Sequence, residues 1–402
     1  MKEHILKDII NANKRSATQR ALLNQFIMQG SSTIPELSKN LGISIPTVTK
    51  SLNELMDKGL VQEVGKRDNS SGRVPTIYDL IPTSGYFIGI DPTINSLAFG
   101  ISDFCGNLVY KKNNIPFHYE DTPACLENLE KLLLDFIDEL TIDKSLILGI
   151  CMNVAERVDP FEGKAYNKYT FLDKPLATAL SEAVGYPVYV DNDSRSMAYG
   201  EYLKGCCNGE KNVVFVNIGW GLGMGLIIDG KLYFGKSGYS GEIGHMSVYD
   251  NDIICHCGKL GCMETEVSGL ALQRKMTKLL MDGGQSILSD KVVNQKQTLT
   301  LPDILDAIAK EDVLSIEALQ KVADELGKNL AGIINIFNPD MLVIGGDLSV
   351  TGDYLIQPVK MGIKKYSLNV VNEDSKIVTS DLKDQAGLIG ACLMARYRTL
   401  SE

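Results

Sequence analysis

Two neighbouring stretches, GEIGHMSV at residues 241–248 and CHCGKLGC at residues 255–262, place one histidine and three cysteines close together in the chain. Three thiolates and one imidazole complete a tetrahedral ligand set for zinc and leave no position open for water. Glycines at positions 258 and 261 allow the sharp turns that bring the last two cysteines onto one ion. We therefore predict a structural zinc site, one ion per chain, with the ligands His245, Cys255, Cys257 and Cys262.

Two other interpretations of this cluster stay open at the level of sequence. The cysteines could be unrelated buried residues, although their spacing is typical of a metal site. His256 lies inside the cluster and competes with His245 for the fourth ligand position. We favour His245 because GEIGH is expected to place it at the end of a strand, beside Glu242. The other six cysteines are scattered, which is typical of packing residues in a reducing compartment.

Residues 15–60 carry the pattern of three short helices. Apolar residues recur at helical spacing in RSATQRALLNQFIMQG. Thr33, Pro35 and Glu36 form a helix-start signal around PELSKNLG, and a third helix is expected to begin at Ser44. The stretches LVQEV and TIYDL then indicate two strands around a polar turn. Three helices followed by a two-stranded hairpin predict a winged helix-turn-helix domain, like those of many bacterial repressors.

The third helix is expected to lie in the major groove of DNA, where short hydroxyl and amide side chains reach base edges and phosphates. Cations in the wing can neutralise phosphates or enter the minor groove. The predicted DNA-binding residues are Ser44, Thr47, Thr49, Lys50 and Asn53 in the helix, and Lys66, Arg67 and Arg73 in the wing. The alternative is a small helical domain that binds protein and carries an ordinary solvated basic loop.

From Tyr86 onward, buried strands alternate with helices, which predicts an α/β fold. The expected strands are YFIGID, SLAFGISD, LVYKKN, LILGICMN, VYVDND, NVVFVNIG, GMGLIID and MLVIGGD. The expected helices are Leu126–Leu140, Leu176–Val184, Leu270–Met281, Leu301–Ala309 and Ile316–Phe337, with a further helix near Gly387–Tyr397.

Two blocks of this region resemble each other. Each has a strand that ends in a polar or glycine turn, then a second strand and a G-x-L hairpin, at Gly106–Leu108 and at Gly230–Leu232. A duplicated β-rich unit with a cleft between its halves is the plan of the actin-like, hexokinase-like fold. We assign residues 1–82 to the DNA-binding domain and residues 83–402 to this two-lobed domain, whose tasks are effector binding and oligomerisation.

The bulk composition narrows the class of protein. The net charge is −10, so DNA binding has to come from a local basic patch. No apolar run reaches the ~18 residues of a membrane span. The N-terminal MKEHILKDII mixes charge into every turn and lacks the apolar core of a signal peptide. We expect a cytoplasmic protein.

At GEIGHMSV and CHCGKLGCMET the chain resembles the ROK family, which contains bacterial sugar kinases and sugar-responsive repressors. The resemblance runs from about Tyr86 to the end of the chain. It implies that His245 binds zinc through one ring nitrogen and a sugar hydroxyl through the other. It also implies a sugar pocket formed by carboxylates, amides and one arginine, which suits a ligand with many hydroxyl groups. The sugar-binding residues implied are Arg157, Asn192, Asp193, Glu242, His245 and Glu264.

The chain departs from the family where ATP phosphates should bind. The first phosphate turn, usually D-x-G-G-T, is Asp91-Pro-Thr-Ile-Asn95, in which proline removes an N–H donor and no glycine permits close approach. The second, usually G-T-G-x-G, carries Trp220 in place of the small hydroxyl residue. A further turn has Asp347 where glycine is usual, and this carboxylate would repel phosphate if it faced inward. We therefore expect no kinase activity, and Asp193 marks only the position of the former catalytic base.

The sugar side departs as well, because the family's Pro-Gly or Gly-Gly turn is Ala155-Glu156 here and Phe171 replaces a tryptophan. Three functions compete. The first is a transcriptional regulator, most simply a repressor of carbohydrate genes, that senses a sugar without phosphorylating it. The second is an ATP-dependent sugar kinase with a regulatory DNA-binding head, and the third is a DNA-binding protein that ignores sugars. The expected partners are a double-stranded operator, a sugar effector and further copies of the chain, as a homodimer or homotetramer.

Overall fold

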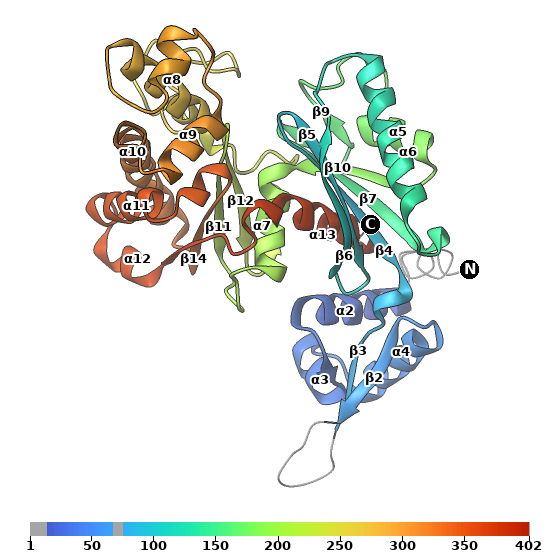
Figure 1. Cartoon of the computed structure of the whole chain (residues 1–402). Coiled ribbons are helices and arrows are strands. Elements are labelled where there is room, and N and C mark those ends of the chain that lie inside the picture. Colours follow the sequence, from blue (N-terminus) through green and yellow to red (C-terminus); the bar gives the residue numbers. More distant parts are fainter. Residues whose placement is uncertain (1–13, 67–74, 402) are drawn as a thin grey trace. The chain divides into compact units, whose positions relative to one another are not determined.

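The computed structural model describes residues 14–66 and 75–401 of the 402-residue chain. The chain forms two compact units, one of residues 1–193 with 388–402 and one of residues 194–387. Figure 1 shows the elements of both units. Within the described residues, no helix is both long and apolar enough to cross a membrane.

The N-terminal domain has the predicted three helices and hairpin (Figure 1). Its elements are α2 (Lys14–Gln29), β1 (Ser32–Thr33), α3 (Ile34–Leu41), α4 (Ile45–Asp57), β2 (Val61–Lys66) and β3 (Thr76–Leu80). Thr33 and Glu36 form a capping box at the start of α3, and Gly42 ends this helix with a φ of 63°. The sequence analysis missed β1, whose two residues pair with β3 to give the strand order β1-β3-β2.

The same unit continues with a five-stranded sheet of order β10-β7-β4-β5-β6. Its strands are β4 (Tyr86–Pro92), β5 (Ser96–Asp103), β6 (Leu108–Pro116), β7 (Ile147–Val154) and β10 (Val188–Asn192), with a small hairpin of β8 (Val158–Asp159) and β9 (Lys164–Ala165). Helices α5 (Pro123–Glu139) and α6 (Leu176–Val184) share one apolar core with this sheet.

The second unit has a sheet of order β13-β12-β11-β14-β15. Its strands are β11 (Val213–Ile218), β12 (Leu222–Ile228), β13 (Lys231–Leu232), β14 (Met341–Gly345) and β15 (Lys376–Thr379). Its helices are α8 (Gly269–Met281), α9 (Leu301–Ala309), α10 (Val313–Phe337), α11 (Asp353–Tyr366) and α12 (Asn369–Asp374). Helices α8 to α11 pack on one face of this sheet in a single core.

The internal duplication predicted from the two sequence blocks is present in the topology. In each five-stranded sheet the first three strands in chain order are antiparallel neighbours, and the last two join in parallel on the side of the first strand. β4 thus corresponds to β11, and β10 corresponds to β15. The α/β fold class and the two similar halves are therefore confirmed.

Three helices were missed from the sequence, and a fourth was only outlined. Helix α7 (Asp193–Lys204) has most of its length buried on several faces, so it shows no one-sided apolar pattern. Helix α13 (Ala386–Ser401), expected near Gly387–Tyr397, is longer than predicted. It lies against β4 so closely that a Cβ at Gly89 would sit 2.7 Å from the backbone nitrogen of Cys392. Helices α11 and α12 and strand β15 were not predicted at all.

This close contact predicts that Gly89→Ala is destabilising. The added methyl meets backbone atoms of α13, which cannot move aside as a side chain can, so we expect a loss of about 1–3 kcal/mol in the free energy of unfolding. The matched control is Gly332→Ala in α10, where an added Cβ meets nothing within 4 Å and should stabilise the helix by about 0.5–1 kcal/mol. Guanidinium unfolding measures both. Equal effects of the two variants would contradict the packing argument.

Candidate functional site

The cysteine cluster is built from three tight turns of the second unit. His245 ends a short 3-10 helix, η3 (Ile243–His245), so the expectation that it stands at the end of a strand was wrong. Cys262 immediately precedes another, η4 (Met263–Thr265). Between them, the N–H of Gly258 donates to the carbonyl of Cys255 at 2.8 Å, and the N–H of Cys255 donates to the carbonyl of Lys259 at 2.8 Å.

The four predicted ligand atoms meet in one place. The Nδ1 or Nε2 of His245 and the Sγ atoms of Cys255, Cys257 and Cys262 all lie within 4.8 Å of one another. In a tetrahedral zinc site, the usual bond lengths imply an S···S separation of about 3.8 Å and an S···N separation of about 3.6 Å. The Sγ atoms of Cys257 and Cys262 are 3.6 Å apart, and Cys255 Sγ lies 3.5 Å from His245 Nδ1. The donor set and its spacing therefore suit a tetrahedral metal ion.

His256 belongs to a second, overlapping group with Cys255 and Glu264. Its Nδ1 lies 2.8 Å from Glu264 Oε1 and 3.8 Å from Cys255 Sγ. The His256 side chain is 54% exposed, whereas that of His245 is 20% exposed. A closed structural site favours the more buried imidazole, and the carboxylate of Glu264 already occupies the Nδ1 of His256.

The thiols need a positive partner in order to bind as thiolates. Burial raises the pKa of Cys255 to about 12, so this thiol carries its proton at neutral pH unless a cation replaces it. Burial also raises the pKa of Cys262, with a contribution from the neighbouring Cys257. A metal ion supplies the charge that makes both thiols deprotonate.

Glu242 and Glu264 flank the cluster on the second unit. Glu242 Oε2 lies 3.8 Å from Nε2 of His245, the ring nitrogen that points away from Cys255. Glu264 is buried, and its Oε2 accepts a hydrogen bond of 3.1 Å from the N–H of Leu222. Although burial raises the pKa of the Glu264 carboxyl, His256 and the Leu222 N–H hold it below its usual value. Glu264 is therefore an ionised group that fixes the glycine turn before β12.

The other implied sugar residues lie together on the first unit. Asn192 Nδ2 donates to the carbonyl oxygen of Glu156 at 3.3 Å and to Asp193 Oδ1 at 3.1 Å. Arg157 Nε donates to Glu156 Oε1 at 3.0 Å. Although burial raises the pKa of Glu156, its bonds with Arg157 lower it overall. The unusual carboxylate noted in the sequence is thus paired with the arginine that was expected to bind sugar.

Lys168 is a member of this group that the sequence analysis missed. Its ammonium lies 4.7 Å from the centre of the Tyr119 ring. Burial lowers the pKa of Lys168, while the charges of Asp193 and Glu156 raise it. The first unit therefore gathers two cations and two carboxylates around Asn192. No spacing motif in NKYTF could have identified the lysine, because the contact depends on how the loop after β9 folds.

The second phosphate turn is bonded to the start of α8 through its carbonyl oxygens. The carbonyl of Gly219 accepts the N–H of Gly269 at 2.7 Å, and the carbonyl of Trp220 accepts the N–H of Leu270 at 3.1 Å. The first two amides of α8 are thus already bonded. Asp347 Oδ2 lies 3.1 Å from the point that a Cβ of Gly219 would occupy, so this carboxylate faces the turn. Desolvation raises the pKa of Asp347.

The first phosphate turn makes hydrogen bonds within itself. The N–H of Thr93 donates to the carbonyl of Ser96 at 2.7 Å, and the hydroxyls of these two residues lie 2.8 Å apart. Asp91 accepts a hydrogen bond of 2.8 Å from Asn153 Nδ2. Pro92 belongs to β4 and has no N–H to offer.

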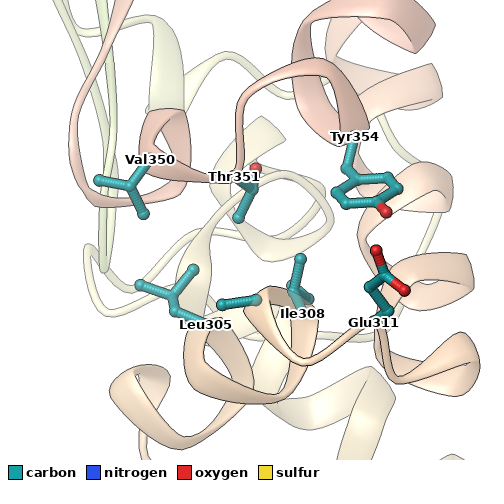
Figure 2. Close-up of a pocket in the computed structure, with 7 residues that line it drawn as sticks. Leu305, Ile308, Glu311, Val350, Thr351 and Tyr354 are labelled. Atoms are coloured by element: carbon teal, nitrogen blue, oxygen red, sulfur yellow. The ribbon is translucent and has the colours of Figure 1, made fainter.

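Two cavities of the second unit are lined by other residues than those described above. Figure 2 shows the smaller, of about 180 Å³, between α9, the 3-10 helix η6 (Asp347–Thr351) and the start of α11. The other, of about 370 Å³, is lined by Met224, Leu226, Tyr233, Gly235, Lys236, Ser237, Tyr239, Ser240, Gly241 and Phe337. Neither is lined by an implied sugar residue, and the smaller is below the ~300 Å³ of usual ligand pockets.

The predicted DNA-contact residues of α4 form one exposed face. Ser44, Thr47, Lys50 and Asn53 are exposed and recur every three residues, while Val48, Leu52 and Leu55 are buried on the opposite side. Thr49 is separate from this face, because it is half-buried and its hydroxyl donates to the carbonyl of Ile45 at 2.9 Å.

Two further parts of this candidate DNA-binding surface are the wing and one exposed apolar residue of α4. Lys66 is exposed at the end of β2, whereas Arg67 and Arg73 lie outside the described residues. The sequence analysis missed Ile45, which is 52% exposed at the first turn of α4. An exposed apolar residue there suits the methyl group of a thymine.

The chain combines a winged helix-turn-helix with two similar actin-like halves, and the second half carries the cysteine–histidine cluster. This combination places the chain among proteins that join a helix-turn-helix head to an actin-like domain. The model of the ROK family matches residues 87–398, and this chain belongs to the ROK family. A model described as "Sugar-specific transcriptional regulator TrmB" matches residues 21–84.

Named transcriptional regulators and a named sugar kinase are both similar to the chain. The xylose repressor of Caldicellulosiruptor bescii is 29% identical over 99% of this chain and 98% of its own length. The glucokinase of Halalkalibacterium halodurans is 30% identical over 76% of this chain and 93% of its own. The crystal structure of a ROK family transcriptional regulator, a homologue of the E. coli MLC protein, has a TM-score of 0.79 and 26% identity, covering 96% of this chain and 98% of that one. The repressor and the regulator extend over the DNA-binding head, whereas the glucokinase aligns with about three quarters of the chain.

Proposed function

We propose that the protein is a DNA-binding transcriptional repressor of carbohydrate genes, whose affinity for its operator changes when a sugar binds, and that it does not phosphorylate the sugar. The observation that carries this proposal is the exposed polar face of α4, in a domain of three helices and a two-stranded hairpin. Full-length similarity to named repressors supports it. We divide the chain into a DNA-binding domain, residues 1–82, and an effector domain, residues 83–402.

In this proposal Ser44, Thr47, Lys50 and Asn53 contact DNA from α4, with Ile45 at the start of the helix. Lys66, Arg67 and Arg73 act from the wing. Because one recognition helix reads a short half-site, two copies of the chain bind a palindromic operator as a homodimer or as part of a homotetramer. Thr49 is assigned no base contact, since its hydroxyl is bonded within the helix.

In this proposal the sugar-binding residues are Arg157, Asn192, Asp193, Glu242, His245 and Glu264. Zinc held by His245, Cys255, Cys257 and Cys262 fixes the imidazole so that Nε2 can meet a sugar hydroxyl. The pairing of Arg157 with Glu156 gives this pocket a different charge pattern from a Pro-Gly turn. The ligand is a sugar or sugar derivative with several hydroxyl groups.

Catalysis is excluded from the proposal on physical grounds. Phosphoryl transfer depends on backbone N–H groups and cations that neutralise the phosphate charge. Here the amides at the start of α8 are bonded to the second turn, and the Asp347 carboxylate faces Gly219. Similarity to a glucokinase keeps a sugar kinase as the second candidate function.

Selection of operator sequences from a random duplex pool tests the main proposal. We expect one palindromic sequence to be enriched, and one sugar among a panel of pentoses, hexoses and amino sugars, including xylose and glucose, to change its affinity by about 5- to 150-fold. Lys50→Ala removes one predicted contact to a phosphate or a base. It should weaken operator binding without changing sugar affinity. Failure to enrich any sequence, with or without sugars, would overturn the proposal.

The zinc ligands are separated by comparing two histidine variants. His245→Ala should lower metal affinity by at least about 10- to 100-fold and lower sugar affinity with it, because the ligand itself is removed. His256→Ala should keep one zinc per chain. Metal content after dialysis against a weak chelator gives the readout. A protein whose zinc depends on His256 and not on His245 would reverse the assignment.

Phosphoryl transfer is tested with ATP and the same sugar panel. We expect no sugar phosphate above the background of a protein-free reaction, because the first phosphate turn has a proline and no glycine, and the carboxylate of Asp347 faces the second. Mass spectrometry of the products detects it. Formation of a sugar phosphate that is lost in Asp193→Asn would make the protein a kinase.

A further inference from the structure

Glu201 of α7 is fully buried and holds two distant segments of the second unit together. Its carboxylate accepts the hydroxyl of Ser380, the N–H of Leu382 at 2.8 Å and the N–H of Asp381 at 3.3 Å. It also accepts the N–H of Cys206 at 3.1 Å. A carboxylate taken out of water is tolerated only when such donors replace its hydration. We call Glu201 and residues 380–382 the clasp.

The clasp connects the two places where the chain passes between the units. The first passage is at the start of α7, between Asp193 and Ser194, and the second is in α13, between Gly387 and Leu388. Residues 380–382 lead through the 3-10 helix η7 (Lys383–Gln385) directly into α13. The hydroxyl of Ser380 also accepts the N–H of Lys383 at 2.9 Å.

Lys383 has a φ of 52°, in the left-handed region that is unfavourable for a lysine. Such a conformation persists only when surrounding contacts enforce it. The Ser380 hydroxyl supplies one of these contacts. The clasp therefore sets the direction in which the chain enters α13.

The other end of α7 carries the proposed effector residues. Asn192 ends β10 and Asp193 begins α7, eight residues and about 12 Å of helix before Glu201. The helix lies close against β12, because Gly223 and Gly225 present no side chain: a Cβ at Gly225 would sit 2.3 Å from that of Ala198. The intervening helix can thus move only as a rigid piece.

Helix α13 in turn reaches the DNA-binding domain by hydrogen bonds within the first unit. Arg396 Nη1 donates to the carbonyl of Phe104 at 3.3 Å, and the N–H of Phe104 donates to the carbonyl of Pro82 at 3.0 Å. Pro82 begins the 3-10 helix η1 (Pro82–Ser84), where the hydroxyl of Ser84 bonds to the carbonyl of Gly59 after α4. Hydrogen bonds therefore connect α13 to the end of the DNA-binding domain through Phe104 and Pro82.

From these contacts we infer that Glu201 is a positioning residue for regulation: it couples a shift of α7, caused by a sugar at Asn192 and Asp193, to the start of α13 and so to the DNA-binding domain. The inference rests on the proposed function.

The test uses the full-length protein and two buried serines. Ser380→Ala removes the hydroxyl that bonds to Glu201 and to Lys383. Ser375→Ala is the matched control, because Ser375 is also buried and donates one hydrogen bond, of 2.7 Å, to the carbonyl of Pro339, away from the clasp. Glu201→Gln, which keeps the size of the side chain but removes its charge, is the second clasp variant.

For each variant, operator affinity is measured with and without the sugar that is active on the unmodified protein, and sugar affinity is measured separately. We expect Ser380→Ala and Glu201→Gln to reduce the sugar-dependent change in operator affinity by about 2- to 30-fold, with sugar affinity nearly unchanged. Ser375→Ala should keep the full change. A merely structural clasp would give all three variants lower stability and an unaltered sugar response, and that result overturns the inference.

Amide hydrogen exchange provides a readout that needs no sugar. We expect faster exchange in residues 383–390 of Ser380→Ala than of Ser375→Ala, and equal exchange would count against the clasp. If no sugar changes operator binding of the unmodified protein, the proposed function fails, and the exchange comparison alone decides whether the clasp holds the start of α13. Ser380→Ala remains available as a test if Glu201→Gln does not fold.

Discussion

A helix can lie against a β-sheet at backbone distance only where the sheet presents no side chain. Both five-stranded sheets of this protein meet that condition with glycines. Gly89, Gly100 and Gly149 leave space for α13, and Gly223 and Gly225 leave space for α7. These are the two helices in which the chain passes between the units. Because interiors are close-packed, each helix is held in one position against its sheet, and the groups at its ends are positioned with it.

Local chemistry made part of the architecture predictable. The capping box at Thr33, the amphipathic helices α9 and α10, and the runs of buried strand residues each carry a period or an end signal in the sequence. Helix α7 carries neither, because Ser194, Arg195 and Glu201 are buried along with its apolar residues. Their burial depends on partners that are distant in sequence, such as Ser380 for Glu201.

The candidate site, like the fold, was only partly predictable from the sequence. The spacing of the three cysteines was enough to bring them together, since a cluster so local needs only its own turns. The choice between His245 and His256 depended on exposure and on the position of Glu264, which spacing does not contain. The pairing of Arg157 with Glu156 was also hidden, although the two residues are adjacent, because adjacent side chains usually point apart. The position of Lys168 was hidden as well, because it depends on the path of the loop after β9.

The two turns that correspond to the phosphate turns of the family have other hydrogen-bond partners in this structure. The turns that carry phosphates in ROK kinases are kept here as structural joints: one receives the amides of α8, and the other closes through Thr93 and Ser96. A buried charge held by several donors is specific for one arrangement, because any other arrangement leaves it poorly solvated. Glu264 fixes the turn before β12 in this way, and Glu201 fixes the entry into α13. Buried carboxyl groups that accept hydrogen bonds from backbone N–H groups therefore define the positions of the turn before β12 and of the entry into α13.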